Sequence, residues 1–160
     1  MDSCSVILLA KASVLETLLE EYAVVVTSSV YKEVMKGKLK LFKDALLVER
    51  LKKEGKLTII SVNTTLMKKL RRDFNMGEGE ASTLAATLKE KEGIIVTDNR
   101  QGRKAAHINN LLLVGSIELV VSLYRKKRIT REKVLHALNI LKDEGWFDDH
   151  LIETAKGDVP

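Results

Sequence analysis

Short runs of apolar, mostly β-branched residues recur along this chain between longer segments with helical spacing. The runs cover residues 23–27, 57–60, 93–97 and 111–114. Short apolar runs separated by helices are typical of strands that are buried on both faces of a parallel sheet. The alternation therefore predicts an α/β fold, with a single parallel sheet flanked by helices.

The segments between these runs have the apolar spacing of helices. Helices are predicted at 5–22, from Ser28–Ser29 through Val34, at 39–54, 64–74 and 81–91, and around Arg103–Ala106. After residue 115 the chain is predicted to be entirely helical, at 116–127, 130–144 and 148–156. We expect one domain over residues 1–145, with a helical C-terminal extension, 146–160, packed on it. Trp146 and Phe147 are expected to anchor this extension, and a patch for a second subunit or a protein partner is the alternative.

Composition limits the class of protein and of site. The chain has 160 residues with one Cys, which excludes an intramolecular disulfide framework and a Cys-only zinc site. Lys and Arg number 27 against 22 Asp and Glu, a balance that favours polyanionic partners, although many basic proteins bind none. No stretch approaches the roughly 20 apolar residues of a membrane span, and the N-terminus does not resemble a secretory signal, so we expect a soluble cytoplasmic protein.

Four acidic residues lie where a parallel sheet would gather them. Asp98 directly follows an apolar run, Glu33 lies one turn into the helix after residue 27, Glu80 opens a helix behind two glycines, and Asp2 precedes the first helix. Each alone is explained by the helix dipole, which favours such a residue by about 0.3–1 kcal/mol. Together they would repel one another, and a bound divalent cation removes that cost.

The donor set indicates which cation would suit this cluster. Carboxylates without a His or Cys cluster favour Mg²⁺ or Mn²⁺ over zinc. Such a site can orient and deprotonate a water molecule for attack on a phosphodiester and can shield the leaving oxygen.

At these residues the sequence resembles the PIN-domain family, the metal-dependent ribonucleases that include VapC-type toxins. The resemblance covers residues 2–145 and follows four acidic motifs in order: Asp2–Ser5 with Leu9–Lys11, Thr27–Val34, Gly77–Ala81, and Val96–Arg100 followed by Arg103 and Ala105–Ala106. The C-terminal part looks most like an archaeal and bacterial branch of PIN-like proteins.

The resemblance implies an endoribonuclease that hydrolyses RNA with a metal-activated water. Asp2, Glu33, Glu80 and Asp98 would be the catalytic and metal-binding residues, and Asn99 would assist in binding Mg²⁺ or Mn²⁺. It also implies a homodimer, and a toxin neutralised by an antitoxin protein. Arg100, Arg103 and Lys104 begin two residues after Asp98 and could hold an RNA phosphate, although a solvated helix face explains them equally well.

Three departures from the family pattern keep a second hypothesis open. Only Met1 precedes Asp2, where family members usually have a short apolar strand. Cys4 stands where a hydroxyl is common, and Asn99 stands where the family often has a second aspartate. The alternative is therefore a catalytically impaired PIN-like module that binds RNA or a protein. A third hypothesis is a structural subunit of a larger RNA-processing assembly, with Trp146 and the late helices as its docking surface.

Overall fold

The computed structural model describes residues 1–40, 42–90 and 93–159. Its elements follow the chain in the order α1 (Ser3–Lys11), α2 (Leu15–Glu21), β1 (Val25–Thr27), α3 (Ser28–Met35), η1 (Lys36–Lys40), α4 (Lys43–Lys53), β2 (Thr58–Ile60), α5 (Thr64–Phe74), α6 (Glu78–Thr87), β3 (Ile94–Val96), α7 (Arg100–Ile108), β4 (Leu112–Val114), α8 (Ser116–Arg125), α9 (Arg131–Glu144) and α10 (Asp149–Gly157). Residue 41 of the predicted helix 39–54, and the predicted helix end at residue 91, lie outside the described residues.

The strands pair in parallel, as the α/β class predicts, and the pairing is divided between two sheets. β1 pairs with β2, with Val26 opposite Ile59, and β3 pairs with β4, with Ile95 opposite Leu113. Among the described residues, each of these sheets has two strands. The single sheet of the prediction is therefore interrupted between β1 and β3.

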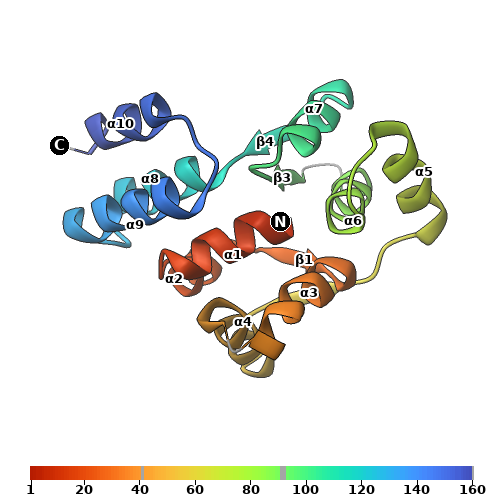
Figure 1. Ribbon diagram of the computed structural model, residues 1–160, viewed down its shortest axis with the longest axis horizontal. Helices are drawn as coiled ribbons and strands as arrows, with labels where there is room; N and C mark the ends of the chain where they lie inside the picture. Colours follow the sequence, from red (N-terminus) through yellow and green to blue (C-terminus); the bar gives the residue numbers. More distant parts are fainter. Residues whose placement is uncertain (41, 91–92, 160) are drawn as a thin grey trace.

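The chain start lies at this interruption. The Met1 amino group donates a hydrogen bond to the Val25 carbonyl of β1 at 3.0 Å. The next amide, that of Asp2, donates to the Val96 carbonyl of β3, also at 3.0 Å. Figure 1 shows the N-terminus between the two strands. Burial lowers the pKa of the Met1 amino group to about 6.

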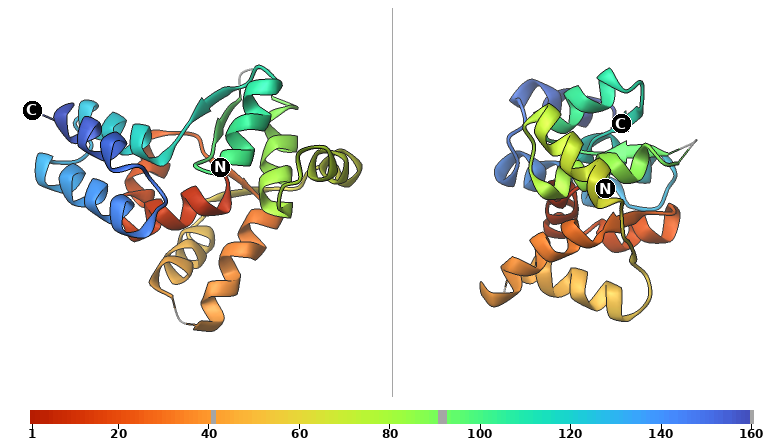
Figure 2. Two further views of the ribbon diagram at one scale, coloured as in Figure 1. Left: turned by 45° about the horizontal axis from the view of Figure 1, so that its top comes forward. Right: turned by 90° about the vertical axis from the view of Figure 1, so that its right-hand side faces the viewer.

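Two hydrophobic cores support the strands from opposite ends of the molecule. The larger core joins α1 and α2 with α3, α4 and the C-terminal helices α8–α10 through side chains such as Leu9, Leu18 and Leu138. The smaller one lies among α5, α6 and α7, where Leu84 and Ile95 are buried. Figures 1 and 2 show α5–α7 at one end and α8–α10 at the other. The first residues of the chain lie between them.

The predicted helix 5–22 is two helices, and the reason is a turn at the exposed residue Ser13. Ser13 adopts φ 57°, in the left-handed region, which ends α1 after Lys11. Ala12 and Val14 on either side of it are fully buried. The turn therefore allows α2 to change direction while the apolar surface on both sides stays in the core.

Of the two aromatic residues predicted to anchor the C-terminal extension, one packs against the core and the other does not. Phe147 packs against the larger core, and α10 adds Ile152 and Ala155 to it. Trp146, in contrast, is fully exposed, so the prediction that it anchors the last helix is wrong. In the described residues no helix is both long enough and apolar enough to cross a membrane.

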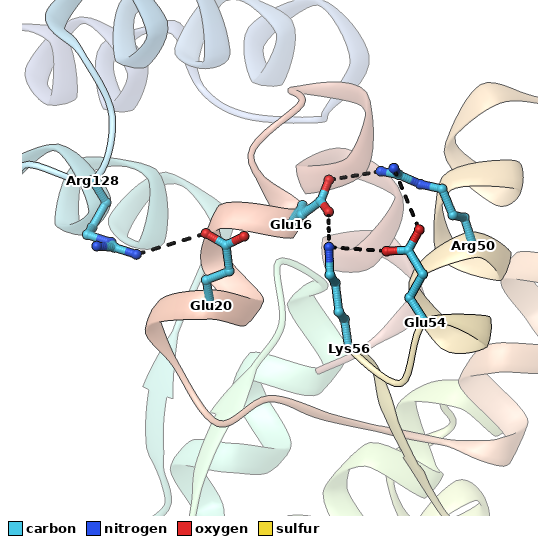
Figure 3. A network of polar contacts seen from close by, with 6 residues as sticks. All are labelled: Glu16, Glu20, Arg50, Glu54, Lys56 and Arg128. Carbon is cyan, nitrogen blue, oxygen red and sulfur yellow. Dashed lines mark hydrogen bonds and ion pairs between the residues drawn. The ribbon is translucent and has the colours of Figure 1, made fainter.

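Ion pairs on the surface connect α2 with its neighbours. Figure 3 shows Glu16 of α2 between Arg50 and Lys56, at 2.8 and 2.6 Å, while Glu54 contacts the same two cations. Arg128, in the turn between α8 and α9, reaches Glu20 at 3.9 Å. Exposed pairs of this kind contribute about 0–1 kcal/mol each, so they orient α2 rather than hold the fold together.

Candidate functional site

Asp2 is a buried carboxylate held in place by two elements. It caps the N-terminus of α1, where one side-chain oxygen accepts the Ser5 N–H at 2.9 Å. Its second oxygen accepts a hydrogen bond from the Thr97 hydroxyl at the end of β3. Because the side chain is only 1% exposed, burial raises the pKa of Asp2. The hydrogen bonds from Thr97 and Ser5 oppose this rise, and the charge of Asp98 adds to it.

Asp98 follows β3 and lies beside Asp2. Its carboxylate accepts hydrogen bonds from the Ser5 hydroxyl at 2.8 Å and from the Ser116 N–H at 2.8 Å. The Ser116 hydroxyl donates a third bond at 2.5 Å. Ser5 therefore contacts both acids, through its N–H to Asp2 and its hydroxyl to Asp98. The N-termini of α1 and α8 fix the two carboxylates with little freedom.

Glu33 reaches the same region from α3. A Cβ added to Gly79, near the start of α6, would lie 2.3 Å from Glu33 Oε2 and 3.6 Å from the Ser3 hydroxyl. The absence of a side chain at Gly79 thus leaves room for the Glu33 carboxylate beside α6. Glu33 is exposed, unlike Asp2, so this carboxylate faces solvent.

Glu80 lies in the first turn of α6 and is half-buried. One of its oxygens accepts the Gly77 N–H at 2.9 Å, which caps the helix. Its neighbour Glu78 points elsewhere and accepts a hydrogen bond from Ser29 at 3.0 Å. Glu78 and Glu80, the two acids of the motif 77–81, thus have different surroundings.

Cys4 reveals how close the four predicted acids are to one another. Desolvation is the main cause that raises the pKa of its thiol to about 12. The charges of Asp2, Asp98, Glu80 and Glu33 raise it further, in that order. All four carboxylates therefore act on one thiol, although they come from the N-cap of α1, from α3 and α6, and from the end of β3. A thiol with so high a pKa stays protonated and is a poor nucleophile.

The residues fit a hard divalent cation in the kind of donor atom that they offer. The oxygen donors are those that Mg²⁺ and Mn²⁺ prefer, and Gly79 leaves space at the Glu33 carboxylate. Among the described residues, no three His, Cys, Asp or Glu side chains are close enough together to hold an ion in their present positions. One Glu80 oxygen is engaged with the Gly77 amide, so an ion that bound this oxygen would compete with that hydrogen bond.

Asn99 and the predicted phosphate-binding residues begin α7. The Asn99 side-chain oxygen caps this helix and accepts the N–H groups of Gln101 at 2.7 Å and Gly102 at 3.2 Å. Its predicted role as a metal ligand would compete with these two bonds. Arg100, Arg103 and Lys104 are exposed. A Cβ at Gly115 would lie 3.2 Å from the Arg103 guanidinium and 2.8 Å from Asp98 Oδ1, so this cation lies near the acidic group.

The structure adds four residues that the sequence analysis did not assign to the site: Ser5, Thr97, Ser116 and Glu118. The three hydroxyls hold Asp2 and Asp98, as described above. Glu118 accepts the Gly115 N–H at 3.1 Å and is a further carboxylate beside Asp98. The position of Ser116 in the sequence could have indicated its role. Ser116 follows Gly115 at the end of an apolar run, much as Asp98 follows the run at 93–97.

Comparison with known proteins agrees with this geometry. A family model described as a PIN domain matches residues 1–156. PIN domains are generally nucleases, and they typically use divalent metal ions. Neither a curated protein nor a solved structure matches the chain. Because the match spans almost the whole length and includes all four acidic motifs, the chain belongs to the PIN-domain family.

Proposed function

We propose that this protein is an endoribonuclease that depends on Mg²⁺ or Mn²⁺ and hydrolyses RNA phosphodiester bonds. Asp2, Glu33, Glu80 and Asp98 are the proposed metal-holding residues. The observation that carries the proposal is geometric: Ser5 contacts both Asp2 and Asp98, and the Glu33 carboxylate lies against Gly79, directly before Glu80. Carboxylates brought together in this way destabilise the fold unless a cation or a proton offsets their repulsion.

The four acids would contribute in different ways. Asp2 and Asp98 are held by hydroxyl and amide donors, so their oxygens are oriented before any ligand arrives. Glu33 and Glu80 are more exposed and can adjust to the ligand. A divalent ion bound here would supply an activated water and would shield the charge on the leaving oxygen.

Cations on two helices support RNA as the substrate class. α5 and α7 both pack against α6, which carries Glu80. α7 presents Arg100, Arg103 and Lys104, and α5 presents Lys68, Lys69, Arg71 and Arg72. None of these seven side chains forms an ion pair with another described residue, whereas Arg50, Lys56 and Lys126 elsewhere on the surface do. Unpaired cations beside an acidic cluster can hold the phosphates of a strand whose scissile bond lies over the carboxylates.

Calorimetry with Mn²⁺, followed by incubation with a labelled single-stranded RNA, tests the proposal. We compare the unchanged chain with Asp98→Asn and Glu80→Gln. Glu78→Gln is the matched control, because Glu78 lies on the same helix and has the same charge but contacts Ser29. We expect Mn²⁺ binding and metal-dependent cleavage in the unchanged chain and the control, and loss of both in the two variants.

Two outcomes would contradict this proposal. If the unchanged chain binds no Mn²⁺ at millimolar concentrations, it is not a metal-dependent nuclease. RNA binding without cleavage at saturating Mn²⁺ would instead support the impaired binding module. A homodimer and a neutralising antitoxin remain predictions, and light scattering on the purified chain tests the first of them.

A further inference from the structure

A groove with a volume of about 470 Å³ lies between α8 and α10 and reaches the acidic site. α8 lines it with Ile117, Val121 and Arg125, which are spaced four residues apart and therefore lie on one face of the helix. Asp98, which contacts the start of α8, lines the same groove together with Arg103. The groove is therefore continuous with the proposed metal site, and its volume is within the range of about 300–1,000 Å³ that is typical of ligand pockets.

The helices α8 and α10 run in the same direction on either side of the groove. Their C-terminal ends are joined by the ion pair of Arg125 with Asp158 at 2.9 Å. Figure 1 shows both helices extending away from the centre of the molecule. The start of α10 and residues 146–148 therefore lie toward the start of α8, where the groove meets Asp98, and the ion pair lies at the far end.

Trp146 lines this groove, and its indole is fully exposed. The residues on either side of it are fixed. Phe147 packs against the larger core, and a Cβ added to Gly145 would lie 2.4 Å from the Phe147 ring, so only glycine leaves room for this ring. Asp148 caps α10 by accepting the His150 N–H at 2.8 Å. The structure therefore holds the backbone of Trp146 in place and leaves a large aromatic surface available to a ligand.

The charges of the groove indicate which part of an RNA would enter it. Four carboxylates and two guanidinium groups line it, those of Asp98, Glu118, Asp148, Asp158, Arg103 and Arg125. Arg125 is paired with Asp158, whereas Arg103 lies near Asp98 and forms no ion pair with a described residue. The excess of carboxylates would repel a phosphate inside the groove, while an uncharged ring would meet apolar side chains there. Arg103 can hold the phosphate beside Asp98.

We propose that the groove is a nucleobase subsite, in which the base next to the scissile phosphate stacks on Trp146. This inference rests on the proposed ribonuclease function, because Asp98 and Arg103 would place that phosphate. The cations of α5 and α7 would hold the rest of the strand at the other end of the molecule (Figure 1). Every base has a π-face, so such a subsite favours an unpaired base over a paired one without reading its identity.

A protein partner is the alternative occupant, and the groove suits it less well. Of the exposed large apolar side chains among the described residues, only Trp146 and Leu151 line this groove. Stable protein interfaces bury about 1,200–2,000 Å² and have an apolar core, which two side chains do not provide. The groove therefore fits a single flat ring better than the surface of a second protein.

Fluorescence in the absence of metal tests the proposal, because Trp146 is the only tryptophan of the sequence. We titrate the unchanged chain, in EDTA, with an RNA tetranucleotide and with an abasic chain of the same number of ribose phosphates. Anisotropy of a labelled tetranucleotide then gives the RNA affinity of Trp146→Ala, Trp146→Phe and Phe42→Ala. The last is the matched control, because Phe42 is an aromatic residue that is 50% exposed and does not line the groove.

We expect the tetranucleotide to quench the indole emission and the abasic chain to leave it unchanged. Trp146→Ala should lower the RNA affinity about fivefold or more, Trp146→Phe should retain most of it, and Phe42→Ala should not change it. Equal quenching by the two ligands, or no quenching at millimolar RNA, would overturn the subsite. A blue shift that appears with rising protein concentration alone would show that a second copy covers the indole, which also overturns it.

The absence of metal separates this result from the test of the nuclease. Mn²⁺-dependent cleavage without quenching would contradict the base subsite alone. Quenching by RNA in a chain that does not cleave at saturating Mn²⁺ would support the subsite and contradict the proposed nuclease.

Discussion

The two most constrained carboxylates of the site depend on hydroxyl groups from three different elements. Ser5 lies in α1, Thr97 follows β3, and Ser116 begins α8; all three are fully or almost fully buried. The Thr97 hydroxyl donates to the buried Asp2, and the hydroxyls of Ser5 and Ser116 donate to the half-buried Asp98. A buried carboxylate that loses one such donor loses a hydrogen bond to a charged group, which is more costly than a neutral one.

Ser116→Ala tests this dependence. Removing the hydroxyl deletes the bond from Ser116 Oγ to Asp98 but keeps the one from the Ser116 N–H. We expect the free energy of unfolding to fall by about 1–3 kcal/mol in urea titrations. Ser61→Ala is the control, because Ser61 is exposed and its hydroxyl contact with Ser28 is long, at 3.4 Å. Similar losses in the two variants would contradict the role given to Ser116.

Gly79→Ala tests whether Glu33 takes part in the metal site, with a substitution that should not destabilise the fold. The added Cβ would lie 2.3 Å from Glu33 Oε2, the end of a flexible side chain that can move away. Alanine is the better helix former, so we expect stability to be unchanged or to rise by up to about 1 kcal/mol. Displacing Glu33 should reduce Mn²⁺ affinity about tenfold or more, measured by calorimetry.

Gly77→Ala is the matched control for this variant. Its Cβ would meet Glu80 Oε2 at 3.7 Å, an ordinary contact. The idea fails if both alanine variants bind Mn²⁺ as the unchanged chain does, because Glu33 would then have no part in the metal site.

At the scale of single residues, sequence reasoning proposed the four acids because each lies at a strand end or within the first turns of a helix that the apolar pattern also marks, and their role in holding a metal stays a prediction. It did not find Ser5 or Thr97, because a hydroxyl beside an acidic residue looks the same in sequence whether it faces the acid or the solvent. It proposed Asn99 as a ligand, whereas the structure shows its oxygen capping α7.

At the scale of elements, α5 offers the clearest test of RNA binding. Lys69→Ala combined with Arg72→Ala removes two unpaired cations from this helix. Arg50→Ala combined with Lys56→Ala removes the same charge from the network of Figure 3, where both cations are paired.

We expect the plot of log affinity against log salt for single-stranded RNA to become less steep by about 1.4 in the α5 variant, which follows from about 0.7 per phosphate contact. Fluorescence anisotropy without metal measures this slope. The slope of the control should not change, and an equal change in both variants would indicate a diffuse effect of net charge rather than contacts on α5.

Most elements were predictable because their apolar spacing agrees with their final environment. The helix α5 matches its predicted bounds, 64–74, and the four strands lie within the predicted runs. The division of helix 5–22 was not predictable, since the left-handed Ser13 is an effect of packing on both sides rather than of local propensity. The interruption of the sheet depends on which strands pair with one another, β1 with β2 and β3 with β4, and periodicity along one strand does not report this pairing.

For the molecule as a whole, the only tryptophan of the sequence provides a probe of assembly. Trp146 is fully exposed, so its emission should be that of a solvated indole and should shift little on unfolding. Trp146→Ala should change the free energy of unfolding by less than about 0.5 kcal/mol. Phe147→Ala, which removes a half-buried ring, should cost more than about 1 kcal/mol. A blue-shifted emission from the native protein would show that an interface covers Trp146.

The acids of the site lie on or next to helices that pack into different hydrophobic cores. Asp2 caps α1 and Glu33 lies on α3, both helices of the larger core, whereas Glu80 lies on α6 of the smaller one. An ion held by all of them would act as a cross-link between two units that can otherwise open separately. Without metal, we expect urea to unfold the α5–α7 region at a lower concentration than the rest. With Mn²⁺, the two transitions should merge into one, so the cation would determine whether this chain unfolds as two cooperative units or as one.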